Sequence, residues 1–273
     1  MAVQNSINTN LGALVALRNM NKTNSELAKT MDRISTGLKV IGAKDDASSF
    51  AIAQGIRAEI KAIQAVQQGL ANGRGVAGVA LAGVTEISNM LIDIKKKVVE
   101  GMNAGNTTAQ QAILDSDFTE LINQIKNFVL NAEFNGKNII SGGGSVNVIA
   151  DSKGGTLQLT AQNMSAVFNA LNAESLATTT TATAALAVVN TQLDTVSQSL
   201  AGLGADARAL DFQDEFLNAI SDSLTEGLGA IVDADLAKES ARLQALQVKQ
   251  QLSVQALSIA NSAPQILLGL FRG

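Results

Sequence analysis

The sequence of 273 residues contains neither cysteine nor histidine. Cysteine thiolates and histidine imidazoles are the usual zinc ligands, and histidine is the side chain best suited to move protons near neutral pH. Their absence excludes a disulfide framework, thiolate metal sites and the common catalytic triads. Catalysis would have to depend on carboxylates, lysine or serine, so we expect a protein that is not an enzyme and holds no cofactor.

Proline and aromatic residues are also scarce, with one proline, eight phenylalanines and no tryptophan or tyrosine. Because a proline inside a helix costs about 3 kcal/mol, nearly the whole chain is free to form long helices. The hydrophobic share of 46% therefore consists mostly of Ala, Leu, Ile and Val. This composition is typical of packed helices.

A strong charge of either sign is absent, because the net charge is -4. A basic face for nucleic acid is therefore not expected. No Lys or Arg precedes Arg18, and no compact apolar block precedes it, which argues against a secretory signal. No stretch approaches the roughly 18 uncharged apolar residues of a membrane span. We expect no nucleic-acid partner, no membrane insertion and, if the protein leaves the cell, a dedicated export machine.

Apolar residues recur near the N-terminus at alternating spacings of three and four residues. They are Leu17, Met20, Leu27, Met31, Ile34, Leu38 and Ile41. This heptad pattern predicts a helix with a coiled-coil seam. Asn24 interrupts the seam, and it either sets the register against a partner helix or marks a solvated kink.

A loop at Val40–Ser49 follows this helix. Gly42 is expected to cap the helix end, because glycine readily adopts the left-handed conformation there. Three residues could cap the start of the next helix: Asp45, Asp46 and Ser48. Helical apolar spacing then continues over residues 52–98 and 114–128.

The pattern changes near residues 132–162, where short stretches alternate between apolar and polar side chains. The alternating apolar residues are Val146, Val148, Leu157 and Leu159. The Gly-containing segment Asp151–Gly155 separates them, which predicts a β-hairpin. A short helix is expected over Ser165–Leu176, and the β-branched run Thr178–Thr181 is expected to be a connection.

The longest heptad seam runs over residues 186–224. Gly227 and Gly229 are expected to end this helix, and Asp233 or Asp235 to cap a last helix. Its apolar residues occupy more than one face, so it needs more than one neighbour. Because each buried Leu, Ile or Val contributes roughly 1.5–3 kcal/mol, the two terminal helices should pair with each other and with other copies.

The predicted fold class is therefore mainly α, with long antiparallel coiled-coil helices from both chain ends and a small β-hairpin region in the middle. Two motifs within it have simpler interpretations than a ligand site. Gly73–Gly78 matches the GxGxxG phosphate-binding pattern, but a helix and not a strand is expected before it. Asp233 and Asp235 could together bind a cation, although helix capping is the preferred interpretation.

Six segments resemble the sequence motifs of bacterial flagellins. They are Ile7–Asn10, Met31–Ala53, Glu133–Gly136, Leu203–Ala205, Val232–Ala237 and Gln255–Leu268. The resemblance spans essentially the whole chain. It implies inner-core helices at residues 1–42 and 231–273, which line the filament, and an outer-core helical domain at residues 43–230. The short segment Asn163–Thr183 implies the core-only type without large variable domains.

The resemblance also implies a function. A flagellin is a structural subunit of the extracellular bacterial flagellum, exported unfolded through the flagellar type III apparatus and polymerised at the tip for cell motility. The implied partners are other copies of the chain, other flagellins, the export apparatus and its chaperone, and the hook-associated junction and cap proteins. A hook-filament junction protein and a helical adaptor or export chaperone are the alternatives. A metallopeptidase insert would require an HExxH motif, which a chain without histidine lacks.

The candidate residues form a surface and not a pocket. For the inner core we expect Leu11, Leu14, Leu17, Leu257, Ile266 and Leu267. For packing of the outer domain or for contacts between subunits we expect Asn24, Leu27, Met31, Arg33, Ile34 and Asp45.

Overall fold

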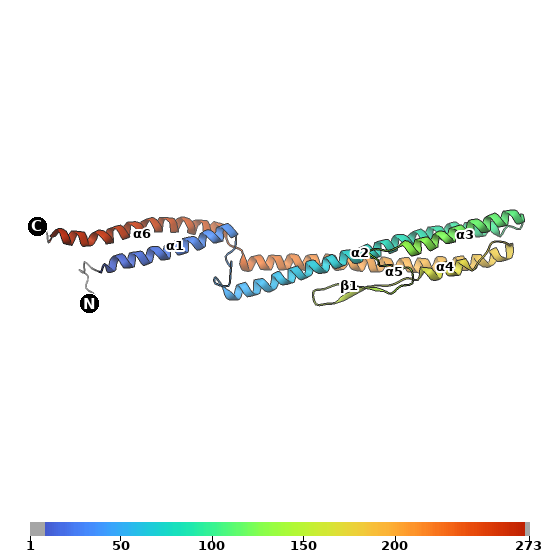
Figure 1. Ribbon diagram of the computed structural model, residues 1–273, viewed down its shortest axis with the longest axis horizontal. Helices are drawn as coiled ribbons and strands as arrows, with labels where there is room; N and C mark the ends of the chain where they lie inside the picture. The colour runs from blue at the N-terminus through green and yellow to red at the C-terminus, as the bar shows by residue number, and fades with distance from the viewer. Residues whose placement is uncertain (1–8, 271–273) are drawn as a thin grey trace. The chain divides into compact units, whose positions relative to one another are not determined.

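The computed structural model describes the backbone of residues 9–270 and the side chains of residues 9–262. Within that part the chain forms six helices and two strands (Figure 1). In order they are α1 (Leu11–Thr36), α2 (Ala47–Gly101), α3 (Thr108–Asn131), β1 (Val146–Ile149), β2 (Thr156–Leu159), α4 (Met164–Asn172), α5 (Thr179–Val232) and α6 (Leu236–Leu270). The predicted mainly α fold, with paired terminal helices and a hairpin in mid-chain, is confirmed.

The chain divides into two compact units. Unit 1 combines residues 1–58 with residues 223–273, and unit 2 comprises residues 59–222. In unit 1, α1 and α6 lie side by side and antiparallel (Figure 1). Polar contacts among the described residues join them, namely Asn10 Nδ2 to Ala260 O at 2.6 Å, Gln250 Nε2 to Asn24 Oδ1 at 2.9 Å and Arg33 Nη1 to Glu239 Oε1 at 3.3 Å.

The end of α1 differs from the prediction. The helix stops at Thr36 because Gly37 adopts the left-handed conformation, with φ of 71°, and its N–H donates to Arg33 O at 2.9 Å. The cap predicted at Gly42 is therefore wrong, and Leu38 and Ile41 lie beyond the helix. Gly37 precedes Gly42 in the chain, but the heptad spacing of apolar residues continues past Gly37 to Ile41, and for that reason the sequence predicts a longer helix.

Asp46 caps the start of α2 and is one of the three caps that the sequence allowed. Its Oδ1 accepts hydrogen bonds from the backbone N–H groups of Ser48 at 3.0 Å and Ser49 at 3.1 Å. The Ser49 hydroxyl donates to Oδ2 at 2.7 Å. These bonds favour the ionised carboxylate, the Ser49 hydroxyl most of all, and hold the pKa of Asp46 below its ordinary value of 3.8.

The two connections of unit 1 run beside each other. The backbone N–H of Lys39 donates to Val232 O at 2.7 Å, and that of Ala234 donates to Gly37 O at 2.8 Å. Val40, Ala53 and Val232 form a small buried cluster at this point. The connections are thus tied together by backbone hydrogen bonds above an apolar cluster.

Both ends of α5 also differ from the prediction. The helix continues through Gly227 and Gly229 to Val232, since a glycine within a helix costs only about 1 kcal/mol and the buried Val232 lies beyond them. At the other end, the run Thr178–Thr181 is not a connection. The Thr178 hydroxyl accepts from the Thr181 N–H at 3.2 Å, so Thr178 caps α5 and the following threonines form its first turn.

Unit 2 is built around the buried faces of α2, α3, α4 and α5. Its fully buried side chains include Leu70, Ile87, Leu91 and Ile94 of α2, Ile125 of α3, Leu171 of α4, and Val189, Val196, Leu203 and Leu210 of α5. Polar contacts at the edges join the helices. Arg74 of α2 forms ion pairs with Asp211 at 3.5 Å and Asp214 at 2.8 Å on α5. Lys97 of α2 donates a hydrogen bond of 2.8 Å to Asp117 of α3, and this bond raises the pKa of Lys97 above its ordinary value of 10.5.

The predicted hairpin is present, with Val146 opposite Leu159 and Ile149 opposite Thr156. It lies against α2 where that helix contains the GxGxxG pattern. A Cβ on Gly73 would come within 2.7 Å of Val148, and one on Gly75 within 2.6 Å of Phe134. The motif therefore lies inside a helix, and its first two glycines let the hairpin and the 132–137 loop approach the helix.

One 18-residue window of α2 is long and apolar enough to cross a membrane by length and composition alone, contrary to the expectation that no stretch approaches such a span. Its mean hydropathy is 1.5, with two or fewer charged residues, and 44% of it is buried inside the protein. The buried core helix of a soluble protein has the same length and composition. The buried side chains of α2 include Val84, Ile87 and Leu91, which agrees with a core helix.

Candidate polymerisation surface

Helix α1 leaves most of its predicted apolar residues open to solvent. The only side chains that α1 buries fully are Thr23 and Thr30. Leu27 and Ile34 are half-buried. The exposed fractions are 54% for Leu11, 46% for Leu14, 39% for Leu17 and 52% for Met31. Contact with α6 therefore leaves an apolar stripe of α1 uncovered, and the neighbouring Val15, at 46%, extends it.

Helix α6 carries a second exposed stripe. Val248, Leu252 and Ile259 are 56%, 59% and 70% exposed, and their spacing of four and seven residues places them on one face. Leu257, the predicted residue in this part, is half-buried. Ile266 and Leu267 lie in α6, but their side chains are outside the described residues. The sequence predicts apolar residues on more than one face of this helix, but apolar spacing does not tell which face a neighbour covers.

Asn24 lies between the two helices and accepts a hydrogen bond from Gln250. It is half-buried, and α1 continues through it to Thr36. A one-residue shift of α6 would separate the two amides. The contact therefore supports the register hypothesis for Asn24 over the solvated kink.

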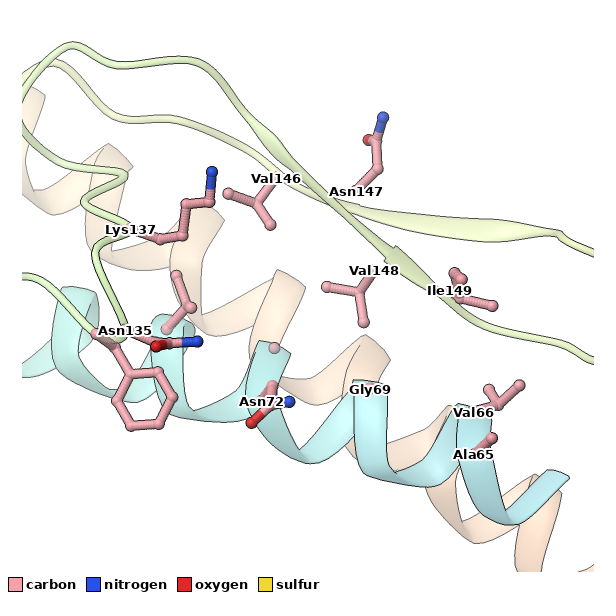
Figure 2. A pocket seen from close by; sticks show the side chains of 13 residues that line it. Ala65, Val66, Gly69, Asn72, Asn135, Lys137, Val146, Asn147, Val148 and Ile149 are labelled. Atoms are coloured by element: carbon pink, nitrogen blue, oxygen red, sulfur yellow. The ribbon is translucent and has the colours of Figure 1, made fainter. Parts of the chain in front are cut away.

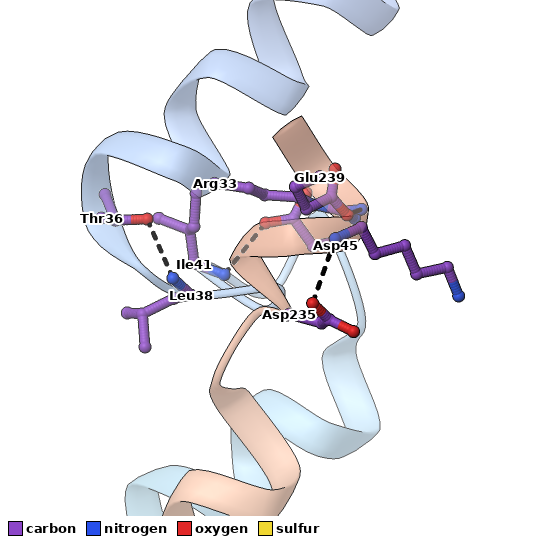
Figure 3. A network of polar contacts seen from close by, with 8 residues as sticks. Arg33, Thr36, Leu38, Ile41, Asp45, Asp235 and Glu239 are labelled. Atoms are coloured by element: carbon purple, nitrogen blue, oxygen red, sulfur yellow. Dashed lines mark hydrogen bonds and ion pairs between the residues drawn. The ribbon is translucent and has the colours of Figure 1, made fainter. Parts of the chain in front are cut away.

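Arg33 and Asp45 belong to a polar junction beside the end of α1 (Figure 3). The Arg33 guanidinium lies 3.3 Å from Glu239, whose side chain is only 11% exposed. Asp45 Oδ2 accepts hydrogen bonds from the backbone N–H groups of Ile41 at 3.2 Å and Gly42 at 3.3 Å. Arg33 thus compensates a buried charge, and Asp45 holds the connection between α1 and α2.

Asp235 completes this junction as the cap of α6. Its Oδ1 accepts from the backbone N–H of Lys238 at 3.0 Å (Figure 3). This agrees with the capping interpretation of the Asp233–Asp235 segment. Among the described residues there is no group of three or more Asp, Glu, His or Cys side chains that could hold a metal ion.

Taken together, unit 1 presents two apolar stripes on a pair of terminal helices and a polar junction that fixes their register. Large exposed apolar patches rimmed by polar residues mark sites of protein association. The class of protein defined by this arrangement is a helical structural subunit with exposed apolar stripes on its terminal helices.

Comparison with known families identifies the subunit further. A model of the bacterial flagellin N-terminal helical region matches residues 7–145, and one of the bacterial flagellin C-terminal helical region matches residues 186–271. The chain belongs to the bacterial flagellin family. It is a structural subunit of the flagellar filament, located outside the cell in the bacterial flagellum, and it is not an enzyme.

Individual relatives agree over the full length. The chain is 42% identical over 272 residues to flagellin FljO of Caulobacter vibrioides, covering 98% of this chain and 99% of that protein. It is 37% identical over 282 residues to a flagellin of Brucella melitensis, with the same coverage. These matches favour a flagellin over the alternatives of a junction protein or a helical adaptor.

A solved structure of a putative flagellar hook-associated protein from Vibrio parahaemolyticus has a related fold. The TM-score is 0.59 at 14% identity, and the match covers 69% of this chain and all of that one. At this identity the likeness concerns the fold alone.

Proposed function

We propose that this flagellin polymerises through α1 and α6, whose exposed stripes are buried against the terminal helices of neighbouring copies. The observation that carries the proposal is that Leu11, Leu14, Val248, Leu252 and Ile259 remain 46–70% exposed although α1 and α6 already pair. Burying a side chain of this kind contributes roughly 1.5–3 kcal/mol. A contact between unlike surfaces extends into an open filament when its rotation does not close a ring.

The core regions of the filament, the export route and the partners of the chain follow from this proposal and from membership of the family. Residues 1–42 and 231–273 form the inner core of the filament, and residues 43–230 form the outer core. The chain is exported unfolded through the flagellar type III apparatus with a chaperone, and it joins the filament beneath a tip cap, beyond the hook-associated junction proteins. The lack of cysteine supports this route, because no disulfide can prevent the chain from extending.

Deletion of Met1 to Asn19 tests the proposal. Purified chain is dissociated by heat, mixed with short filament seeds and examined by negative-stain electron microscopy. We expect long filaments from the full chain and none from the truncated chain. Filaments of normal length from the truncated chain would refute polymerisation through α1.

A set of substitutions tests α6 without shortening the chain. Val248, Leu252 and Ile259 are each replaced by Ser, and because all three are more than half exposed, the isolated subunit should keep its fold. A matched control replaces Ile92, Val99 and Ile113, which are 58%, 54% and 63% exposed in unit 2. We expect filament growth to stop only in the α6 variant. If the α6 variant formed filaments as readily as the control variant and the unchanged chain, the α6 stripe would be excluded as a contact.

A further inference from the structure

An apolar groove lies between α2 and the hairpin (Figure 2). Its volume is about 340 Å³. The lining is made mostly of small or branched apolar residues, namely Ala65, Val66, Gly69, Gly73, Val76 and Val148. Gly69 lies on the α2 side of the groove, and a Cβ added there would meet no atom within 4 Å. The helix thus faces open space at this point.

Two phenylalanines project from another part of unit 2. Phe212 and Phe216 of α5 are 69% and 59% exposed, and they are the most exposed phenylalanines of the described residues. They lie one helical turn apart, with the exposed Glu215 on the same face. Exposed aromatic pairs of this kind are typical anchors of protein interfaces.

We propose that Phe212 and Phe216 of one copy bind in the groove between α2 and β1 of a neighbouring copy. The contact rests on the proposed polymerisation and adds a site in unit 2 to the terminal helices. An apolar cavity of about 150 Å³ holds one benzene ring, so a groove of about 340 Å³ has room for two phenyl rings.

The dimensions of the two surfaces agree. One helical turn separates the two rings by about 5.4 Å along α5. The groove follows α2 from Ala65 to Gly73, where Val148 packs against the helix, which is about 12 Å at 1.5 Å per residue. Both rings can therefore lie along the groove.

The charges beside the two surfaces are complementary. Lys137 lines the groove, and Glu215 lies between the two phenylalanines. Within the described part of the chain, neither Lys137 nor Glu215 belongs to an ion pair. A second copy that inserts its phenylalanines brings the carboxylate of Glu215 to the side of the groove that carries Lys137. Because the projecting and receiving surfaces differ, the contact leaves one of each free and permits continued growth.

Gly69→Leu tests the groove by filling it. Leucine is a better helix former than glycine, so α2 should not be weakened. The matched control is Gly78→Leu, since Gly78 also lies in α2 with nothing within 4 Å of an added Cβ and does not line the groove. We expect the critical concentration for growth on seeds to rise about tenfold or more with Gly69→Leu, and to stay near that of the unchanged chain with Gly78→Leu. Unchanged growth of the Gly69→Leu variant would overturn the proposal.

Cross-linking tests the pairing directly, because the chain has no cysteine of its own. Lys137→Cys and Glu215→Cys chains are prepared separately, polymerised alone or as an equal mixture, and oxidised. We expect disulfide-linked dimers from the mixture and none from either variant alone. Filaments of the mixture without dimers would overturn this contact and leave polymerisation through the terminal helices intact. Absence of filaments from the unchanged chain would instead overturn the proposed function, and the contact with it.

Discussion

The Arg33–Glu239 pair joins α1 and α6 where the Glu239 side chain is only 11% exposed. Glu239 Oε2 is buried and has no hydrogen-bond partner within the described residues, so Arg33 is the main compensation for its charge. Arg33→Met leaves the carboxylate without a cation, and we expect the free energy of unfolding of unit 1 to fall by about 1–3 kcal/mol. Thermal unfolding followed by circular dichroism measures the change.

The double variant Arg33→Met with Glu239→Met is the control for this prediction. It removes both charges and keeps the apolar volume, so most of the lost stability should return. If the double variant were less stable than Arg33→Met alone, the ion pair would not be the cause of the loss.

Asp46 makes the stability of unit 1 depend on pH in the acid range. Its pKa is lower in the folded chain than the ordinary 3.8, so its stabilising effect is present above pH 3.8 and is lost as the pH falls through the folded pKa. Asp46→Asn keeps a good helix cap that does not titrate. We expect Asp46→Asn to match the unchanged chain at pH 6 and to lose less stability as the pH falls below about 4. Parallel acid titrations of the two chains would contradict this role for Asp46.

At the scale of the elements, the approach of the hairpin to α2 depends on glycine. Gly73→Ala places a methyl group 2.7 Å from Val148, and we expect it to lower the free energy of unfolding of unit 2 by about 1–3 kcal/mol. Gly78→Ala has open space around it and should raise stability by about 0.5–1 kcal/mol through its helix propensity. Urea unfolding of the two variants measures both effects, and a gain from Gly73→Ala would contradict close packing here.

The sequence predicted the elements well where the signal was local. Alternation at Val146 and Val148, followed by a Gly-containing turn, was sufficient for the hairpin, and heptad spacing was sufficient for the long helices. Helix ends were less predictable. Gly227 and Gly229 resemble an end, but the neighbouring Val232 is buried and the helix continues to it. A glycine does not end a helix when burial of the residues beyond it contributes more than the roughly 1 kcal/mol that the glycine costs.

The candidate surface was predictable only in part. Leu11, Leu14 and Leu17 were recognised as apolar residues of a terminal helix, and they are exposed in the subunit. The sequence predicts apolar residues on more than one face of α6, but it does not predict that Val248 and Leu252 stay exposed, and it does not predict the groove beside Gly69. These features depend on which atoms from distant parts of the sequence cover a given face, and spacing along one helix carries no information about that.

At the scale of the whole molecule, the two units bury very different amounts of apolar surface. In the described part of unit 1 the buried apolar side chains are Val40, Ala53, Val232 and Leu246, whereas unit 2 buries long rows of Ile, Leu and Val. We expect the amides of α1 to exchange with solvent at least about a hundredfold faster than those of the buried part of α2 in the isolated subunit. Hydrogen exchange read by mass spectrometry tests this, and in filaments the difference should shrink. Equal protection of α1 and α2 in the isolated subunit would contradict the expectation.

The pairing of α1 with α6 affects the order in which parts of the chain fold. Its polar contacts join residues that are 206, 226 and 250 positions apart. Closing so long a loop costs entropy before any contact forms, and contacts between distant positions form slowly. The elements of unit 2 can pack together without α6, because residues 59–222 all precede it in the chain. A chain that emerges N-terminus first therefore carries α1 without its partner until residues beyond Leu236 have emerged. For such a chain we expect the pairing of α1 with α6 to be the last step of folding.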